Sequence, residues 1–302
     1  MDNKEIKRIQ NMYKKKTDPQ FQDYFHATRK SFGLWLSLII SVIFLHGCAF
    51  YSSSNAITPP VEKNCVIPSD QSKTISGRWS TYPIPIAFFS GNFGSGELSA
   101  ITKAADTWNT FFNSSQSVEQ VINYGTSDSP TPSSAINPAS GGSVCAQGII
   151  QGSTYRGNVV LYKLTSWPSA YSNSAIALTT FCTLPAQPIP KFYMAIIEFN
   201  YQGFFANGTR QPDLESIILH EFGHMIGLNH SCENTTRTGV PNCADPNINS
   251  DYLSASMFPA FAFDQTGAGE VRNNLNSNDQ GRANCIYQNS VTSTTSTSLV
   301  SP

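Results

Sequence analysis

Residues 220–230 read HEFGHMIGLNH, and this stretch decides both the fold and the chemistry that the sequence predicts. His220 and His224 are four residues apart, so on a helix their side chains project from one face and can reach one metal ion. Gly227 can adopt backbone angles that other residues avoid, so the helix can end there and the chain can bring His230 in from another direction. Three neutral imidazoles leave the fourth position of a tetrahedral zinc ion open for water.

Glu221 follows the first of these histidines and is the natural general base. A carboxylate that neighbours a ligand without being one can take a proton from a water and pass it to a departing amine. Zinc assists because it lowers the pKa of its bound water to about 7. The alternative is a buried helix that carries histidines by chance, but five specified positions rarely coincide in one short window. The other two histidines, His26 and His46, precede the predicted mature chain.

The pattern H-E-x-x-H-x-x-G-x-x-H resembles the extended motif of the metzincin zinc endopeptidases, and among these the matrixins most. The zinc helix of matrixins often begins with Asp-Leu, as at Asp213 and Leu214, and their third histidine is followed by serine, as at Ser231. Residues 254–259, SASMFP, resemble the methionine turn of the family. The resemblance implies that Met257 lies beneath the zinc ligands, where its soft sulfur packs and does not bind the metal.

Two substrate-binding elements are also implied by the resemblance. Residues 175–180, AIALTT, resemble the exposed edge strand, with Ala177 and Leu178 beside an extended substrate whose backbone pairs with the strand. An ordinary interior strand is the alternative reading. The residues after the methionine turn are expected to form an apolar pocket for the side chain that follows the scissile bond: Phe258, Pro259, Ala260 and Phe261.

The fold that the resemblance implies is α+β, of the metzincin type, over about residues 76–287. A twisted mixed β-sheet should pack on two long helices, with a smaller irregular C-terminal subdomain that begins near Gly227. Periodicity indicates one helix around Trp108, and Asp213 is expected to cap the zinc helix. The predicted strands comprise residues 84–89, 158–164 and 192–199, the first of which contains a proline and is expected early in the sheet or at its edge.

Zinc, as one catalytic ion, is the expected cofactor. Animal matrixins hold a second, structural zinc through histidines between two of the strands, and this chain has no histidine there. Calcium is a further candidate, although scattered Asp and Asn residues form no readable calcium motif.

Four segments are predicted along the chain. Residues 1–48 combine a basic leader with an apolar run, which is typical of an export signal. The apolar run ends in Leu45-His46-Gly47-Cys48, which resembles a bacterial lipobox, so Cys48 is the candidate lipid attachment site; an uncleaved membrane anchor is the alternative. Residues 49–75 are predicted to be a flexible tether, residues 76–288 the zinc metalloprotease domain, and residues 289–302 a Ser/Thr-rich disordered tail.

Six cysteines follow Cys48, an even number that suits an exported protein with disulfide bonds. Cys232 and Cys243 are close enough in the sequence to clip one local loop, and we predict that pair. The remaining four cysteines have no pairing that the sequence can decide. We therefore expect the chain to lie outside the cytoplasm, tethered to a membrane or secreted.

A nucleic-acid binder is excluded by charge, because the formal net charge is −1 and eight of the 19 basic residues lie within the first 30 positions. We expect a monomeric zinc endopeptidase that hydrolyses peptide bonds of extracytoplasmic proteins through a zinc-bound water activated by Glu221. One alternative is a non-catalytic zinc-containing surface protein that binds peptide or matrix in its cleft. Another is a zinc hydrolase acting on non-peptide bonds. The intact Glu221 favours an enzyme.

Overall fold

The computed structural model describes residues 61–88, 93–124, 159–184, 189–205, 210–234 and 237–287. All of them belong to one unit that spans residues 59–302. The predicted leader, the apolar run, Cys48 and the C-terminal tail lie outside the described residues. Within these six ranges, no helix has the length and apolar character that crossing a membrane requires.

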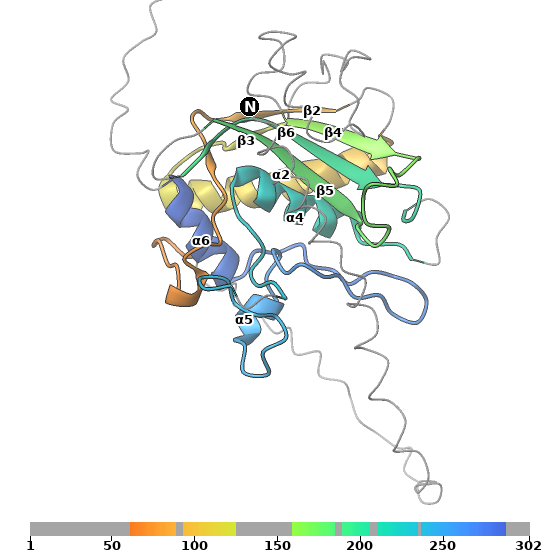
Figure 1. Cartoon of the computed structure of the whole chain (residues 1–302). Helices are drawn as coiled ribbons and strands as arrows, with labels where there is room; N and C mark the ends of the chain where they lie inside the picture. Colours follow the sequence, from red (N-terminus) through yellow and green to blue (C-terminus); the bar gives the residue numbers. More distant parts are fainter. Residues whose placement is uncertain are drawn as a thin grey trace, which may run out of the picture. The chain divides into compact units, whose positions relative to one another are not determined.

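A six-stranded sheet forms the upper layer of the domain (Figure 1). Four strands lie side by side in parallel, in the order β3 (Ile122–Asn123), β2 (Ile84–Phe88), β4 (Val159–Leu164) and β6 (Lys191–Asn200). A short strand, β1 (Arg78–Trp79), pairs in parallel with the start of β6. The antiparallel strand β5 (Ala177–Leu184) pairs with β6 alone among the described strands and so forms the edge of the sheet. The sheet is therefore mixed, as predicted.

Strand β2 comes early in the chain, which is one of the two placements that its proline suggested, and not at the edge of the sheet. The strand, which contains Pro85, lies between β3 and β4. The proline is tolerated there because the ladder with β4 begins one residue later, at Ile86, and β3 pairs with only two residues of β2. The missing N–H group of the proline therefore falls at the end of a ladder.

Two helices, α2 (Ser95–Gln116) and α4 (Leu214–Ile226), cover the lower face of the sheet (Figure 1). The apolar stripe of α2 is buried between the sheet and α4, and Trp108 has no exposed surface. Its indole Nε1 donates to the carbonyl oxygen of Leu219 at 3.1 Å, which joins the two helices in the core. The predicted fold, a mixed sheet on two long helices, is thus confirmed.

The part of the chain after Gly227 contains little regular structure. It includes the short helix α5 (Ser250–Leu253) and the final helix α6 (Ser277–Tyr287), which lie below α4 in Figure 1. The disulfide between Cys232 and Cys243 clips the loop between them, as predicted from their spacing. A second disulfide joins Cys65 to Cys285, and Cys182 is also disulfide-bonded.

The N-terminal segment differs from the flexible tether that its composition suggested. Residues 61–75 include the 3₁₀-helix η2 (Ser69–Gln71) and pack against the lower part of the domain. Gln71 is fully buried, and its side chain donates to the carbonyl oxygen of Ser231 and accepts from Asn278. The disulfide through Cys65 adds a covalent link to α6. The ordered domain therefore begins before residue 76.

Candidate metal centre

Helix α4 carries two of the predicted ligands, and both of its ends are defined by side-chain chemistry. Asp213 is the N-cap, and its carboxylate accepts from the backbone N–H of Ser216 at 2.9 Å. Gly227 ends the helix with φ 123°, a conformation that favours glycine. A Cβ atom there would stand 2.2 Å from the carbonyl oxygen of Gly77. The glycine thus lets the chain turn under the sheet and reach His230.

Hydrogen bonds indicate which nitrogen of each helical histidine carries the proton. Nδ1 of His220 lies 2.7 Å from the carbonyl oxygen of Ser256, and Nδ1 of His224 lies 2.8 Å from that of Leu228. A carbonyl oxygen only accepts, so each Nδ1 carries the proton and each Nε2 presents a lone pair. This is the arrangement that orients metal-binding imidazoles in proteins.

The structure brings His220, His224 and His230 together. Their ligand atoms all lie within 4.8 Å of one another, and the Nε2 atoms of His224 and His230 are 3.2 Å apart. A tetrahedral zinc ion with bonds of about 2.0–2.1 Å holds its ligand atoms roughly 3.3 Å apart. The three imidazoles fit a zinc ion in ligand type, and the separation between the Nε2 atoms of His224 and His230 also matches the expected distance.

The protonation state of His220 also suits a metal ligand. Burial lowers the pKa of His220 to about 3, and the neighbouring His224 adds to that effect. The imidazole is therefore neutral at physiological pH, and the neutral form is the one that can bind a metal.

Glu221, the residue that follows His220, is buried, and a hydroxyl from the sheet holds its carboxylate. Oγ1 of Thr179 on β5 donates to Oε2 of Glu221 at 2.5 Å. Burial raises the pKa of Glu221 to about 7, and the hydrogen bond from Thr179 opposes that rise. A carboxylate with a pKa near neutrality is suited to taking up and releasing a proton.

Met257 lies directly against α4. It is fully buried, and a Cβ atom added at Gly223 would stand 2.1 Å from its sulfur. Its carbonyl oxygen accepts from the backbone N–H of Ser231, the residue that follows His230. Met257 therefore contacts both α4, next to His224, and the segment that follows His230.

Asp279 on α6 supports this turn and was not singled out from the sequence. Its two carboxylate oxygens accept from the backbone N–H groups of Ser256 and Met257, at 2.7 Å and 3.2 Å. Burial raises the pKa of Asp279, and the buried guanidinium of Arg282, 3.8 Å away, opposes that rise. Asp279 thus holds the peptide whose carbonyl oxygen, that of Ser256, orients His220.

Phe261, one of the residues predicted to form an apolar pocket, lies beside His220. The ring of Phe261 makes an edge-to-face contact with the His220 ring, with 5.8 Å between centroids. The guanidinium of Arg272 lies 4.9 Å and 5.1 Å from the ring centroids of Phe258 and Phe261. Its Nη1 donates to the carbonyl oxygen of Ala260 at 2.9 Å. Arg272, which the sequence did not reveal, thus packs against this wall.

Strand β5 places the predicted substrate strand at the sheet edge. Ala177 and Leu178 pair with Phe199 and Glu198 of β6, and both are half-buried. Thr179, the next residue, contacts Glu221 as described above. Nothing in the sequence distinguished Thr179, because a single threonine in a strand forms no motif with other residues.

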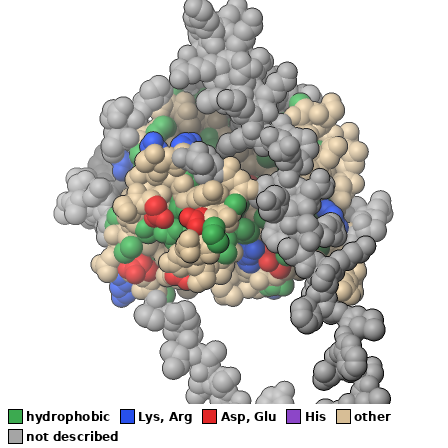
Figure 2. Space-filling model, turned by 60° about the horizontal axis from the view of Figure 1, so that its bottom comes forward, with side chains coloured by type: hydrophobic (Ala, Val, Ile, Leu, Met, Phe, Trp, Pro, Cys, Tyr) green, Lys and Arg blue, Asp and Glu red, His purple; other side chains and the backbone are tan. Residues whose placement is uncertain are grey.

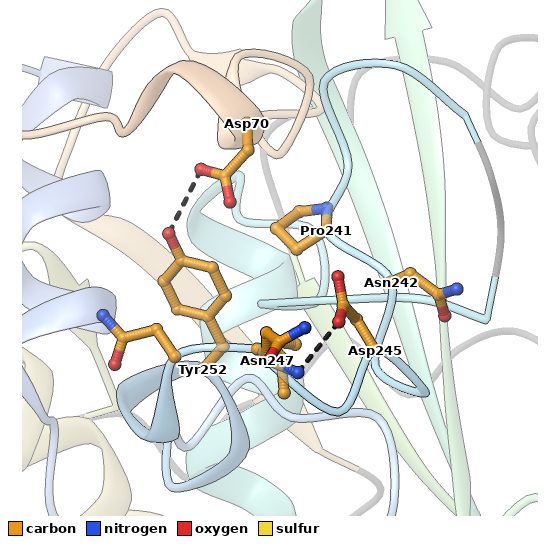
Figure 3. A pocket seen from close by; sticks show the side chains of 8 residues that line it. Asp70, Pro241, Asn242, Asp245, Asn247 and Tyr252 are labelled. Carbon is orange, nitrogen blue, oxygen red and sulfur yellow. Dashed lines mark hydrogen bonds between the residues drawn. The ribbon is translucent and has the colours of Figure 1, made fainter.

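A separate pocket of about 400 Å³ lies at the base of the domain, beside α5 (Figure 3). It is formed partly by the loop that the Cys232–Cys243 disulfide closes, and none of its lining residues was predicted as a site residue. The carboxylate of Asp70 accepts from the Tyr252 hydroxyl at 3.1 Å, and that of Asp245 accepts from the backbone N–H of Asn247 at 2.8 Å. These carboxylates thus accept hydrogen bonds from within the protein, and we assign the chemistry to the histidine cluster.

The underside of the molecule shows acidic side chains interspersed with apolar ones (Figure 2). Lys and Arg side chains appear at several separate places on this face.

In a comparison with protein families, residues 99–237 match the model of the family described as Matrixin, peptidase M10. The matched segment begins in α2 and includes the three histidines and Glu221. No curated protein matches the chain.

Proposed function

We propose that the chain, which carries a matrixin-like metzincin domain, is a zinc-dependent endopeptidase that acts on exported proteins or peptides. The observation that carries the proposal is the convergence of three imidazole nitrogens within 4.8 Å beside a buried carboxylate. His220, His224 and His230 would hold the ion. When bound there, zinc supplies a Lewis acid that polarises both the attacking water and the peptide carbonyl.

Glu221 would act as general base and then as general acid. Its carboxylate takes one proton from the attacking water while the oxygen of that water bonds to the peptide carbon. The same proton then passes to the amide nitrogen as the carbon–nitrogen bond breaks, so one residue serves both steps. The buried position of Glu221 keeps competing water away from the carboxylate.

Substrate binding is proposed at the edge strand and at the apolar wall. An extended peptide would pair with the free side of β5 near Ala177 and Leu178, which requires no particular sequence. The wall formed by residues 258–261 lies next to His220 through Phe261, so we propose that it receives an apolar side chain from the substrate. Met257 would support the ligands by packing beneath them.

An extracytoplasmic location is part of the proposal. Two disulfides join described residues, and disulfides persist in oxidising compartments. Tethering through a lipid on Cys48 is proposed from the sequence alone. Mass analysis of the exported protein tests it, because a lipidated N-terminal Cys48 and an intact leader differ by their masses.

The experiment that tests the activity compares the purified protein with a Glu221→Gln variant on a generic unfolded protein substrate, with and without a chelator. We expect the wild-type protein to cleave, the chelator to abolish cleavage and added zinc to restore it. Glu221→Gln should bind one zinc per chain and lose at least about 100-fold in rate. Equal behaviour of the two proteins would overturn the proposal and favour a non-catalytic peptide-binding role.

A further inference from the structure

We propose that Thr179 is a positioning residue for Glu221, and that its hydroxyl directs both proton transfers to the same carboxylate oxygen. This inference rests on the proposed function, because it concerns how the base of that reaction is held. Its starting point is the 2.5 Å hydrogen bond from Thr179 Oγ1 to Glu221 Oε2.

The sheet determines which hydroxyl of β5 can reach the base. Thr179 pairs with Ile197, which lies in the core between the sheet and the helices, so the two side chains share the face that looks towards α4. Thr180 pairs with Ile196, which belongs to the apolar cluster on the opposite face. Because side chains alternate along a strand, only the first of these two threonines lies beside Glu221.

Hydrogen-bond chemistry fixes the direction of the contact. An ionised carboxylate only accepts, so the threonine hydroxyl donates its single proton to Oε2. A charge-assisted bond of this kind is stronger than a neutral one and limits rotation of the carboxylate plane. One lone pair of Oε2 is thereby engaged, and we infer that Oε1 is the oxygen that faces the substrate and receives the proton of the attacking water.

The same contact orders the second step. The proton that leaves the water forms an O–H bond at Oε1, while Oε2 continues to accept from Thr179. The proton therefore stays on the oxygen that faces the substrate and moves from there to the amide nitrogen. Without the hydroxyl, the carboxyl group could rotate and carry the proton away from the reacting atoms.

The test uses three full-length variants: Thr179→Val, which keeps the shape and removes the hydroxyl, Thr179→Ser, which keeps the hydroxyl, and Thr180→Val as the matched control. For one peptide substrate, kcat per bound zinc and KM are measured separately. We expect Thr179→Val to lower kcat by about tenfold with KM changed less than about twofold, and we expect the other two variants to remain near wild type.

A second readout does not depend on turnover. Acetohydroxamate chelates zinc and offers a proton to an adjacent carboxylate, so its affinity reports how well Glu221 is placed. Calorimetry on the zinc-loaded proteins should show about tenfold weaker binding to Thr179→Val and unchanged binding to Thr180→Val.

The possible failures are distinguishable. If the wild-type protein does not cleave, the proposed function fails and this inference with it. If the wild-type protein cleaves and Thr179→Val matches it in kcat and in acetohydroxamate affinity, only the inference is overturned. A Thr179→Val protein that loses zinc but keeps its kcat per bound zinc would show a merely structural role, and would overturn it as well.

Discussion

The sulfur of Met257 occupies the space that a side chain at position 223 would fill, because a Cβ atom at Gly223 would stand 2.1 Å from it. Gly223 lies one residue before His224, so this contact joins the turn around Met257 directly to the ligand-bearing helix. The absence of a side chain at position 223 is therefore what allows Met257 to pack against this helix.

Replacing Gly223 with alanine should force Met257 away from α4. We expect a loss of about 1–3 kcal/mol in the free energy of unfolding, as for other overpacked cores, and weaker zinc binding. Denaturant titration and competition with a chelator measure the two effects. Gly96→Ala is the matched control, because nothing lies within 4 Å of an added Cβ atom there. The control should be neutral or stabilise α2 by up to about 1 kcal/mol, as alanine favours a helix.

Asp279→Asn should loosen the turn that orients His220. The variant puts an amide NH₂ group against backbone N–H donors and leaves the buried Arg282 without its carboxylate. We expect about 3–5 kcal/mol of destabilisation and about 10–100-fold weaker zinc binding. Denaturation and chelator competition are the measurements, with the exposed Asp251→Asn as control. If Asp279→Asn bound zinc as tightly as the wild-type protein, the inference that Asp279 holds Ser256 in position to orient His220 would be contradicted.

Stability should fall with rising pH because of Glu198. Burial raises the pKa of Glu198 to about 7, while a hydrogen bond from Tyr171 opposes that rise. A carboxyl group whose pKa is higher in the folded than in the unfolded protein contributes its full stability below the unfolded-state pKa, about 4.3. The folded protein loses that contribution as the pH rises towards 7.

Thermal or denaturant unfolding between pH 4 and pH 8 measures this effect. The free energy of unfolding of the wild-type protein should decrease between pH 4 and pH 8. We expect this decrease to be smaller in Glu198→Gln, by at most about 3 kcal/mol. The exposed Glu119→Gln should follow the wild-type curve. Parallel curves for the wild-type and Glu198→Gln proteins would show that this carboxyl group does not titrate in that interval.

The two disulfides should differ in how much they stabilise the domain. Cys65 and Cys285 are 220 residues apart, whereas Cys232 and Cys243 are 11 apart. Chain entropy predicts about 5 kcal/mol for the long loop and about 3 kcal/mol for the short one. Double Cys→Ser variants of each pair, compared by denaturant unfolding, test the ranking. If removal of the Cys232–Cys243 disulfide cost more stability than removal of the Cys65–Cys285 disulfide, local packing and not loop length would determine the effect.

Much of the metal centre was predictable from the sequence because it rests on local spacing. The four-residue interval between His220 and His224, the capping Asp213 and the helix-ending Gly227 all act within one helix and its ends. The edge strand and the disulfide between Cys232 and Cys243 followed from the resemblance and from proximity. The family match and the described geometry agree with this part of the prediction.

The supporting residues were not predictable, because each acts through a long-range partner. Gln71 lies in a stretch whose composition is typical of a linker, yet it is buried through bonds to residues more than 150 positions away. Thr179 and Asp279 act on Glu221 and on Ser256 from other elements. Such pairings have no periodicity along the chain, and only the fold brings them together. The interior position of β2 escaped prediction similarly, because it depends on where the neighbouring ladder starts.

The link between Cys65 and Cys285 also bears on what happens when this protein is itself attacked. Nearly the entire domain lies between these two residues, so hydrolysis of any single peptide bond in that interval leaves both pieces in one covalent molecule. A nicked chain would migrate as intact without reductant and as fragments after reduction. Self-digestion in a surface loop would therefore not by itself release the histidine-bearing half from the half that carries the edge strand.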